Sequence, residues 1–316
     1  MSSGVETESE TMQCCASCGK AGSDDIKLRS CTACYLVKYC SVICQKDHRS
    51  QHKKECKKRA AELHDEILFK QPESSCFGDC PICCLPLPID LSIDAKKAIF
   101  MTCCSKRVCA GCCYATLQRE EEERLQHKCP FCRWAMPIGA TKEREINERL
   151  MKRIEVNDPI AMCSMGKEKC FGGDYQAAFE YWTKAAALGN VEAHYQLSML
   201  YYKGKGVEKN EKRELHHAEQ AAIGGHPDAR HNLGCLERDN GRMDRAAKHL
   251  IIASKLGNDR SLERVKDLYK DGFVSKDDFT AALRGYQTAI IAMKSPQRDE
   301  AAEFAKWQRS AERKLF

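Results

Sequence analysis

The first 132 residues carry side chains suited to binding metal ions, and these side chains occur in short, regularly spaced pairs. Of the 22 cysteines in the 316-residue chain, 19 lie before residue 133. Two thiolates separated by two residues can reach one tetrahedral zinc ion, and an imidazole can replace a thiolate. Cysteines of a chain without secretion signals stay reduced, so metal binding is a better prediction for them than disulfides. The pattern therefore predicts structural metal sites rather than a catalytic centre.

The first group of ligands spans residues 15–56. It contains four pairs with two or three residues between the partners: Cys15 and Cys18, Cys31 and Cys34, Cys40 and Cys44, His52 and Cys56. Ligands four apart lie on one face of a helix and can share an ion. Eight ligands are enough for two zinc ions, while Cys14 and His48 are neighbours that could compete for them.

The order CASCGK, CTAC, YC-x3-C and H-x3-C resembles the MYND zinc finger over residues 15–56. The resemblance implies a crossed arrangement of two zinc ions, with Cys15, Cys18, Cys40 and Cys44 on one and Cys31, Cys34, His52 and Cys56 on the other. It also implies that this finger binds short peptides containing proline. Because all four positions of each ion are filled by the protein, neither ion is open for catalysis.

A second group of pairs follows in residues 80–132: Cys80 and Cys83, Cys103 and Cys104, Cys109 and Cys112, Cys129 and Cys132. The segments CPIC and CPFCR resemble a RING finger over residues 80–133. A RING finger usually has histidine three residues before its fifth ligand, whereas this chain has Lys106 there.

Cys104 matches the third ligand of the RING pattern, and Cys103 is the available substitute for the missing one. The expected third ion is held by Cys80, Cys83, Cys109 and Cys112, and the fourth by Cys103, Cys104, Cys129 and Cys132. This brings the expected total to about four zinc ions. Possible alternative ligands are Cys84, Cys113 and His127.

The RING resemblance also implies a surface for a ubiquitin-conjugating enzyme and for ubiquitin. The positions that match are Ile82, Leu117, Pro130 and Arg133. The alternative is that the three apolar residues simply pack the finger. The acidic run Glu120–Glu123 is expected to be a solvated helix face.

Beyond residue 141 the sequence is helical in pattern, with a repeated unit. Residues 138–156 predict an amphipathic linking helix, and then Gly189, Gly224 and Gly257 mark equivalent positions 35 and 33 residues apart. Such a period, with alanines at packing positions, predicts a solenoid of helix pairs. The segment YYKGKGVEKN and the alanine-rich repeat ends resemble the Sel-one-like repeat of the tetratricopeptide superfamily.

The expected fold is therefore small zinc-stabilised fingers followed by an all-α helical-repeat solenoid. The expected parts are a disordered tail (1–13), the MYND-type finger (14–58), a helical linker (59–75), the RING-like finger (76–137), the linking helix (138–156), repeats of about four units (157–294) and a C-terminal capping helix (295–316).

Several function classes are excluded or weakened by the composition. No apolar run is long enough for a membrane helix, and the polar start MSSGVETESE does not resemble a signal peptide, so a nuclear or cytoplasmic protein is expected. No catalytic constellation is present. The favoured function is a RING-type ubiquitin ligase or ligase adaptor whose other modules select proteins. The alternatives are a non-enzymatic scaffold and, more weakly, a nucleic-acid-associated regulator, based on the net charge of +5 in residues 45–59.

Overall fold

A computed structural model of the chain describes residues 14–89, 98–137, 139 and 142–312. The chain divides into two compact units, Met1–Lys70 and Gln71–Phe316. Within the described residues, none of the helices has the length and apolar character needed to cross a membrane. The predicted tail at residues 1–13 lies outside the described residues.

The first unit is a small finger that runs into a long helix. Strands β1 (Arg29–Ser30) and β2 (Lys38–Tyr39) form an antiparallel ladder, which is followed by helices α1 (Val42–Asp47) and α2 (Arg49–Leu68). The buried cluster of the finger consists of Cys15, Cys31, Cys34 and Tyr39. Three of these four are cysteines, so the finger has almost no conventional apolar core and depends on its metal sites for stability.

Helix α2 also accounts for the basic stretch. Only His52 and Leu68 are buried along its 20 residues, and Lys53, Lys54, Lys57 and Lys58 face solvent. The Arg59 guanidinium lies 3.3 Å from the Glu62 carboxylate and 3.0 Å from that of Glu66. The charges therefore line a solvated helix, in which part of the positive charge is offset by acidic neighbours.

The second unit begins with the second group of cysteines. Strands β3 (Ala98–Met101) and β4 (Lys106–Cys109) form an antiparallel hairpin with Ala98 opposite Cys109, and helix α3 (Ala110–Glu122) follows directly. Leu87 and Val108 are buried together with the cysteines of this region. The Cys109 Sγ accepts a hydrogen bond from the Cys112 backbone N–H, so a metal ligand also caps the helix.

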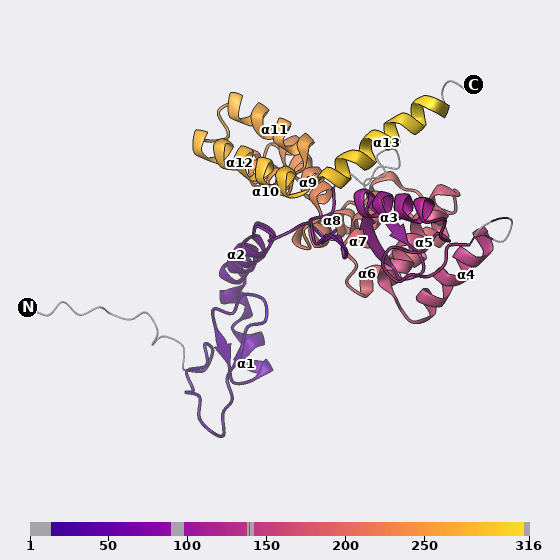
Figure 1. Cartoon of the computed structure of the whole chain (residues 1–316). Helices are drawn as coiled ribbons and strands as arrows, with labels where there is room; N and C mark the ends of the chain where they lie inside the picture. Colours follow the sequence, from indigo (N-terminus) through magenta and orange to yellow (C-terminus); the bar gives the residue numbers. More distant parts are fainter. Residues whose placement is uncertain (1–13, 90–97, 138, 140–141, 313–316) are drawn as a thin grey trace, which may run out of the picture. The chain divides into compact units, whose positions relative to one another are not determined.

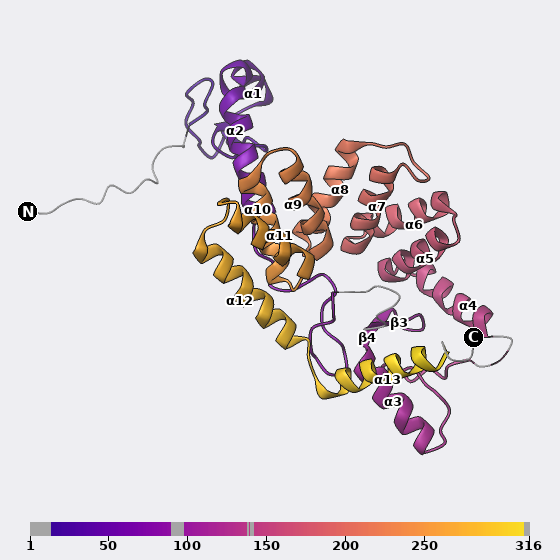
Figure 2. The same cartoon turned by 90° about the horizontal axis from the view of Figure 1, so that it is seen from above.

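The helical repeats follow, and Figure 2 shows helices α5 to α10 as a curved row. The helices of this region are α4 (Lys142–Glu155), α5 (Pro159–Phe171), α6 (Tyr175–Ala187), α7 (Val191–Lys203), α8 (Glu211–Ile223), α9 (Pro227–Asp239), α10 (Met243–Lys255), α11 (Asp259–Lys270) and α12 (Lys276–Ala292). Helices α5 to α12 form four successive pairs, in the place expected for the repeats. The chain is thus a cysteine-rich finger region followed by an all-α solenoid.

Local chemistry explains where these helices begin. Asp158, Asp174, Asn190, Asn210 and Asn258 precede helices, and each accepts a hydrogen bond from a backbone N–H of the first turn through its side chain. Helices end near glycines with positive φ, such as Gly189 (φ 81°) and Gly257 (φ 96°). In the second repeat Gly225 (φ 83°), rather than the marker Gly224, adopts this conformation.

The packing between the helices follows from small residues facing large ones. Ala178, Ala185, Ala193, Ala221 and Ala246 are completely buried. Their small side chains allow close approach of neighbouring helices, while larger side chains fill the layers between them. The prediction of alanines at helix-packing positions is thereby confirmed.

The second finger contacts the solenoid within the second unit. The Cys76 N–H donates to the Gly225 carbonyl oxygen over 3.1 Å, and the Phe77 ring packs edge-on against His226 with ring centroids 5.5 Å apart. A Cβ on Gly225 would lie 2.9 Å from the Ser74 carbonyl oxygen, so glycine at this position permits the close approach.

A buried ion cluster lies beside this contact. The Glu192 carboxylate is 2.7 Å from Lys167 Nζ and 3.3 Å from His226 Nε2. Burial acts to raise the pKa of Glu192, but the hydrogen bond from His226 and the charge of Lys167 outweigh it and hold the pKa well below its usual range. The buried Glu192 carboxylate is therefore paired with two side chains of the solenoid, next to the contact with the finger.

The last helix, α13 (Pro296–Glu312), has a position that the repeat pattern does not indicate. It was expected to cap the solenoid, but it packs against α3 of the second finger, near the starts of both helices (Figures 1 and 2). The rings of Tyr114 on α3 and Phe304 on α13 have centroids 5.0 Å apart. An amphipathic helix with a solvated outer face suits either position, so its sequence pattern does not distinguish between them.

One prediction concerns the packing of the first repeat. A Cβ on Gly166 would lie 2.5 Å from Nε1 of Trp182, which is buried and donates to the Cys163 carbonyl oxygen. We expect Gly166→Ala to destabilise the repeats by about 1–3 kcal/mol through overpacking. Urea unfolding followed by far-UV circular dichroism measures this effect.

The matched control is Gly172→Ala, since a Cβ there meets its nearest atoms at an ordinary 3.6 Å with a helical backbone. Equal unfolding midpoints for the two variants would contradict the prediction.

Candidate metal centres

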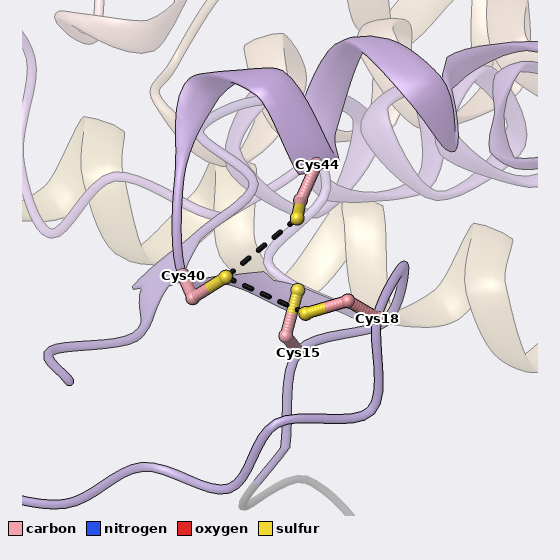
Figure 3. A group of neighbouring side chains, drawn as sticks. All are labelled: Cys15, Cys18, Cys40 and Cys44. Atoms are coloured by element: carbon pink, nitrogen blue, oxygen red, sulfur yellow. Dashed lines mark hydrogen bonds between the residues drawn. The ribbon is translucent and has the colours of Figure 1, made fainter.

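The first centre brings together Cys15, Cys18, Cys40 and Cys44 (Figure 3). Their sulfur atoms all lie within 4.8 Å of one another, and the Cys40 Sγ is 3.6 Å from the sulfurs of both Cys18 and Cys44. Zinc–sulfur bonds of about 2.3 Å in a tetrahedron place the sulfurs about 3.8 Å apart. The spacing therefore fits a zinc ion.

Backbone hydrogen bonds prepare this centre for a cation. The N–H groups of Cys18 and Cys40 point at the Cys15 sulfur and lower the pKa of its thiol to about 6. A thiolate is the form that binds zinc. The Ser41 hydroxyl accepts the Cys44 N–H at the start of α1, which fixes the ligand on the helix.

The second centre combines Cys31, Cys34, His52 and Cys56. The sulfurs of Cys31 and Cys56 are 3.7 Å apart, and the Cys34 Sγ is 3.2 Å from His52 Nε2. Burial raises the pKa of Cys31, but the N–H groups of Ala33 and Cys34 lower it more, to about 6. Helix α2 supplies His52 and Cys56 from one face, because residues four positions apart lie on the same face of a helix.

The neighbouring residues that could compete lie elsewhere. Nδ1 of His48 is 3.1 Å from the Tyr39 hydroxyl, and the His48 ring stacks on His52 with centroids 5.7 Å apart. Cys14 is exposed and belongs to none of the ligand groups in the described residues. His48 therefore orients a ligand by packing, and does not act as one.

The third centre combines Cys80, Cys83, Cys109 and Cys112, with the sulfurs of Cys83 and Cys109 3.7 Å apart. The Cys109 N–H donates to the Cys80 sulfur over 3.4 Å. Burial raises the pKa of Cys83, but the Leu85 N–H and the Arg298 guanidinium outweigh it and lower the pKa to about 7.

The fourth centre combines Cys103, Cys104, Cys129 and Cys132. The Cys132 and Cys103 sulfurs are 3.4 Å apart, and those of Cys104 and Cys129 are 3.9 Å apart. Adjacent cysteines can share a site because the chain turns sharply here. The Ser105 N–H donates to the Met101 carbonyl over 2.8 Å, and Ser105 has φ of 55°.

Lys106, in the position where histidine was missing, contacts an aromatic ring of the same finger. Its Nζ lies over the Phe131 ring, 5.8 Å from the centroid. Cys103 thus occupies the position that the sequence left open.

A shared backbone turn builds the pairs with two intervening residues. In three of these pairs, the backbone N–H of the first cysteine donates to the carbonyl oxygen of the fifth residue after it, and its own carbonyl oxygen accepts from the N–H of the fourth residue after it. The residues involved are Cys15 with Lys20 and Gly19, Cys80 with Leu85 and Cys84, and Cys129 with Trp134 and Arg133. The residue after the second ligand has positive φ, at 73° in Gly19, 55° in Cys84 and 61° in Arg133. The same local structure therefore aims both sulfurs inward each time.

The suggested alternative ligands have other surroundings. Cys84 is exposed, and Cys113 is buried with its sulfur 4.0 Å from the Val108 carbonyl oxygen. Burial raises the pKa of Cys113 to about 12, which keeps its thiol protonated. Nδ1 of His127 lies 3.4 Å from the Glu120 carboxylate.

Glu120 differs from the solvated face expected for residues 120–123. Its side chain is 1% exposed, whereas Glu121, Glu122 and Glu123 face solvent. Oε2 accepts the Lys128 N–H over 3.2 Å, and Oε1 lies 3.8 Å from the Arg133 guanidinium. Glu120 therefore holds the loop that carries Cys129 and Cys132. A run of four identical residues gave no signal for this role.

The positions assigned by the RING resemblance lie at the surface of the second finger. Ile82 and Leu117 are each 42% exposed, and Pro130 is half-buried. Phe131, which lies between the ligands Cys129 and Cys132, is also 42% exposed. Arg133 is half-exposed and faces Glu120.

Comparison with protein families assigns two parts of the chain. Residues 15–56 match the MYND finger, and residues 159–190 and 191–226 match the Sel1 repeat. The chain carries a MYND finger and Sel1 repeats. These two matches support a role in protein interaction for the parts concerned, and the Cys and His clusters provide about four sites compatible with zinc.

Similar proteins share only parts of the chain. A mouse protein described as DAP3-binding cell death enhancer 1 is 23% identical over 190 residues, which cover 48% of this chain and 37% of that protein. The match thus spans well under half the length of this relative.

Two solved structures also resemble the chain. A Sel1 repeat protein from Oxalobacter formigenes has a TM-score of 0.39 at 19% identity, covering 51% of this chain and 76% of that one. The protective antigen c5321 of uropathogenic Escherichia coli, which has an SLR fold, has a TM-score of 0.31 at 19% identity, covering 52% and 48%.

The centres predict a metal content that depends on Cys103. We expect about four zinc ions per chain by elemental analysis, and about three in Cys103→Ser, because three ligands hold zinc less tightly. Cys84→Ser is the matched control, since this exposed cysteine of the same finger is outside the four groups. Two zinc ions in the unaltered chain, or a full complement in Cys103→Ser, would contradict the assignment.

Proposed function

We propose that the chain is a zinc-dependent RING-type ubiquitin ligase, or an adaptor for such a ligase. The second finger would recruit a ubiquitin-conjugating enzyme, and the MYND finger and the repeats would select proteins for modification. The observation that carries this proposal is the crossed order of the ligand pairs. In the second finger, Cys80 and Cys83 share their site with Cys109 and Cys112. Cys103 and Cys104 share theirs with Cys129 and Cys132.

This crossed order is the arrangement to which the CPIC and CPFCR segments pointed. All four ligand positions of each centre come from the protein, so neither ion could perform the transfer itself. The chemistry would belong to the conjugating enzyme, and the finger would act by holding that enzyme close to its target. Exposed apolar side chains at Ile82 and Leu117 support a docking surface of this kind.

The selection of substrates would use two other surfaces. On the MYND finger, Tyr35, Val42 and Ile43 are 67%, 60% and 71% exposed, which supports the binding of short apolar or proline-containing peptides. In the second unit a cavity of about 1110 Å³ is lined by the solenoid, the second finger and α13, with Tyr195, Phe77 and Ala302 among its lining residues. This cavity would accept part of a protein surface.

A specific observation also supports the non-enzymatic scaffold. Arg133, the position that would contact ubiquitin, already faces the buried Glu120 carboxylate at 3.8 Å. If this ion pair holds in the complex, the finger would bind partners without promoting transfer. Both functions share the protein-interaction role of the modules.

A self-ubiquitination assay with a panel of conjugating enzymes distinguishes the two. We expect the unaltered chain to be modified, and Ile82→Ala to lose most of this activity, because it removes an apolar contact of the docking surface. Leu125→Ala is the matched control, since Leu125 is 46% exposed on the same finger but lies outside the docking positions. Both variants should retain about four zinc ions.

Activity that survives in Ile82→Ala at the control's level would contradict the assigned surface. If the unaltered chain is not ubiquitinated with any enzyme of the panel, the ligase function would be excluded and the scaffold function would remain.

A further inference from the structure

Arg298, in the first turn of α13, reaches into the second finger. One terminal nitrogen donates to the carbonyl oxygens of Pro86 and Met293, each over 2.7 Å. The other donates to the Leu85 carbonyl over 3.2 Å and approaches the Cys83 sulfur at 3.5 Å. The side chain is only 9% exposed, although it lies 215 residues beyond Cys83 in the sequence.

The charge of the third centre explains why a cation is useful at this place. Four thiolates around one zinc ion carry a net charge of about −2. Cys80, Cys109 and Cys112 are buried, so water cannot stabilise that charge. The N–H groups of Cys109 and Cys112 donate to sulfurs of the group, and Arg298 adds a donor that is itself charged.

A second contact brings α13 to this position independently of the guanidinium. A Cβ on Gly111 would lie 2.8 Å from both the backbone nitrogen of Arg298 and the backbone carbonyl carbon of Gln297. The start of α3 and the first turn of α13 therefore touch backbone to backbone, next to two zinc ligands. The Tyr114 and Phe304 rings extend the contact further along both helices.

We propose that Arg298 is a positioning residue of the third zinc centre, and that α13 is therefore a working part of the second finger. Arg298 compensates the charge of the centre and fixes the turn that carries Cys83. Loss of this residue lowers the zinc affinity of that one centre. The inference concerns metal binding alone and stands whether or not the finger acts in ubiquitin transfer.

A chelator competition on the full chain tests the proposal. We expect Arg298→Ala to give up one of its zinc ions at chelator concentrations roughly 10–100-fold lower than the unaltered chain, as is usual when a partner of a metal ligand is lost. Arg298→Lys should fall between the two, because an ammonium keeps the charge but cannot make the same forked set of contacts. Lys306→Ala is the control, since Lys306 lies on the same helix and pairs only with the exposed Glu303 among the described contacts.

The zinc ions of the MYND finger serve as an internal reference in every variant. If Arg298→Ala kept all of its zinc ions up to the same chelator concentration as the unaltered chain, the proposal would be overturned. Equal loss from every centre would also overturn it, because it would indicate general unfolding.

Gly111→Ala provides a second route to the same result. Alanine favours helix over glycine, so it should not weaken α3 itself, but its Cβ would push the first turn of α13 away. We expect loss of the same single zinc ion, and little further loss when Arg298→Ala is added. Fully additive effects of the two substitutions would show that they act separately and would contradict the proposal.

Discussion

Thiolates held within 4.8 Å of one another repel unless a cation lies among them, and four groups of side chains in this chain meet that condition. The repulsion makes each finger conditional on metal, because neither the first finger nor the turns of the second have enough apolar surface to impose the geometry alone. Backbone N–H groups aimed at the sulfurs reduce the repulsion before any ion binds.

The ligand groups could be predicted because metal geometry is expressed in short sequence spacings. A pair such as Cys15 and Cys18 shares one turn, and His52 and Cys56 share one helix face, so local patterns identify them. The helix pairs were predictable for the same reason, since capping residues and buried alanines recur with the repeat period. Cys103 was identified by elimination, and the positive φ of Ser105 supplies the irregular backbone that two adjacent ligands need.

What the sequence did not reveal depends on packing between distant parts. Glu120 is buried while three identical neighbours are exposed, and only the path of the following loop distinguishes it. The location of α13 is a similar case, because its helical pattern is compatible with more than one neighbour. Gly111 has an ordinary helical backbone, so its role as a point of close approach becomes visible only when the second helix is in place.

The contact between α3 and α13 has a consequence for the order of events during synthesis. Cys132, the last ligand of the second finger, leaves the ribosome well before Pro296 begins α13. At about 5–20 residues per second, the intervening 160 or so residues take roughly ten to thirty seconds to translate. During that interval the finger lacks its final helical neighbour, while the MYND finger, in its own compact unit, has all of its ligands. Helix α13, the last element to be synthesised, thus completes the second finger, and this finger reaches its final structure later than the MYND finger does.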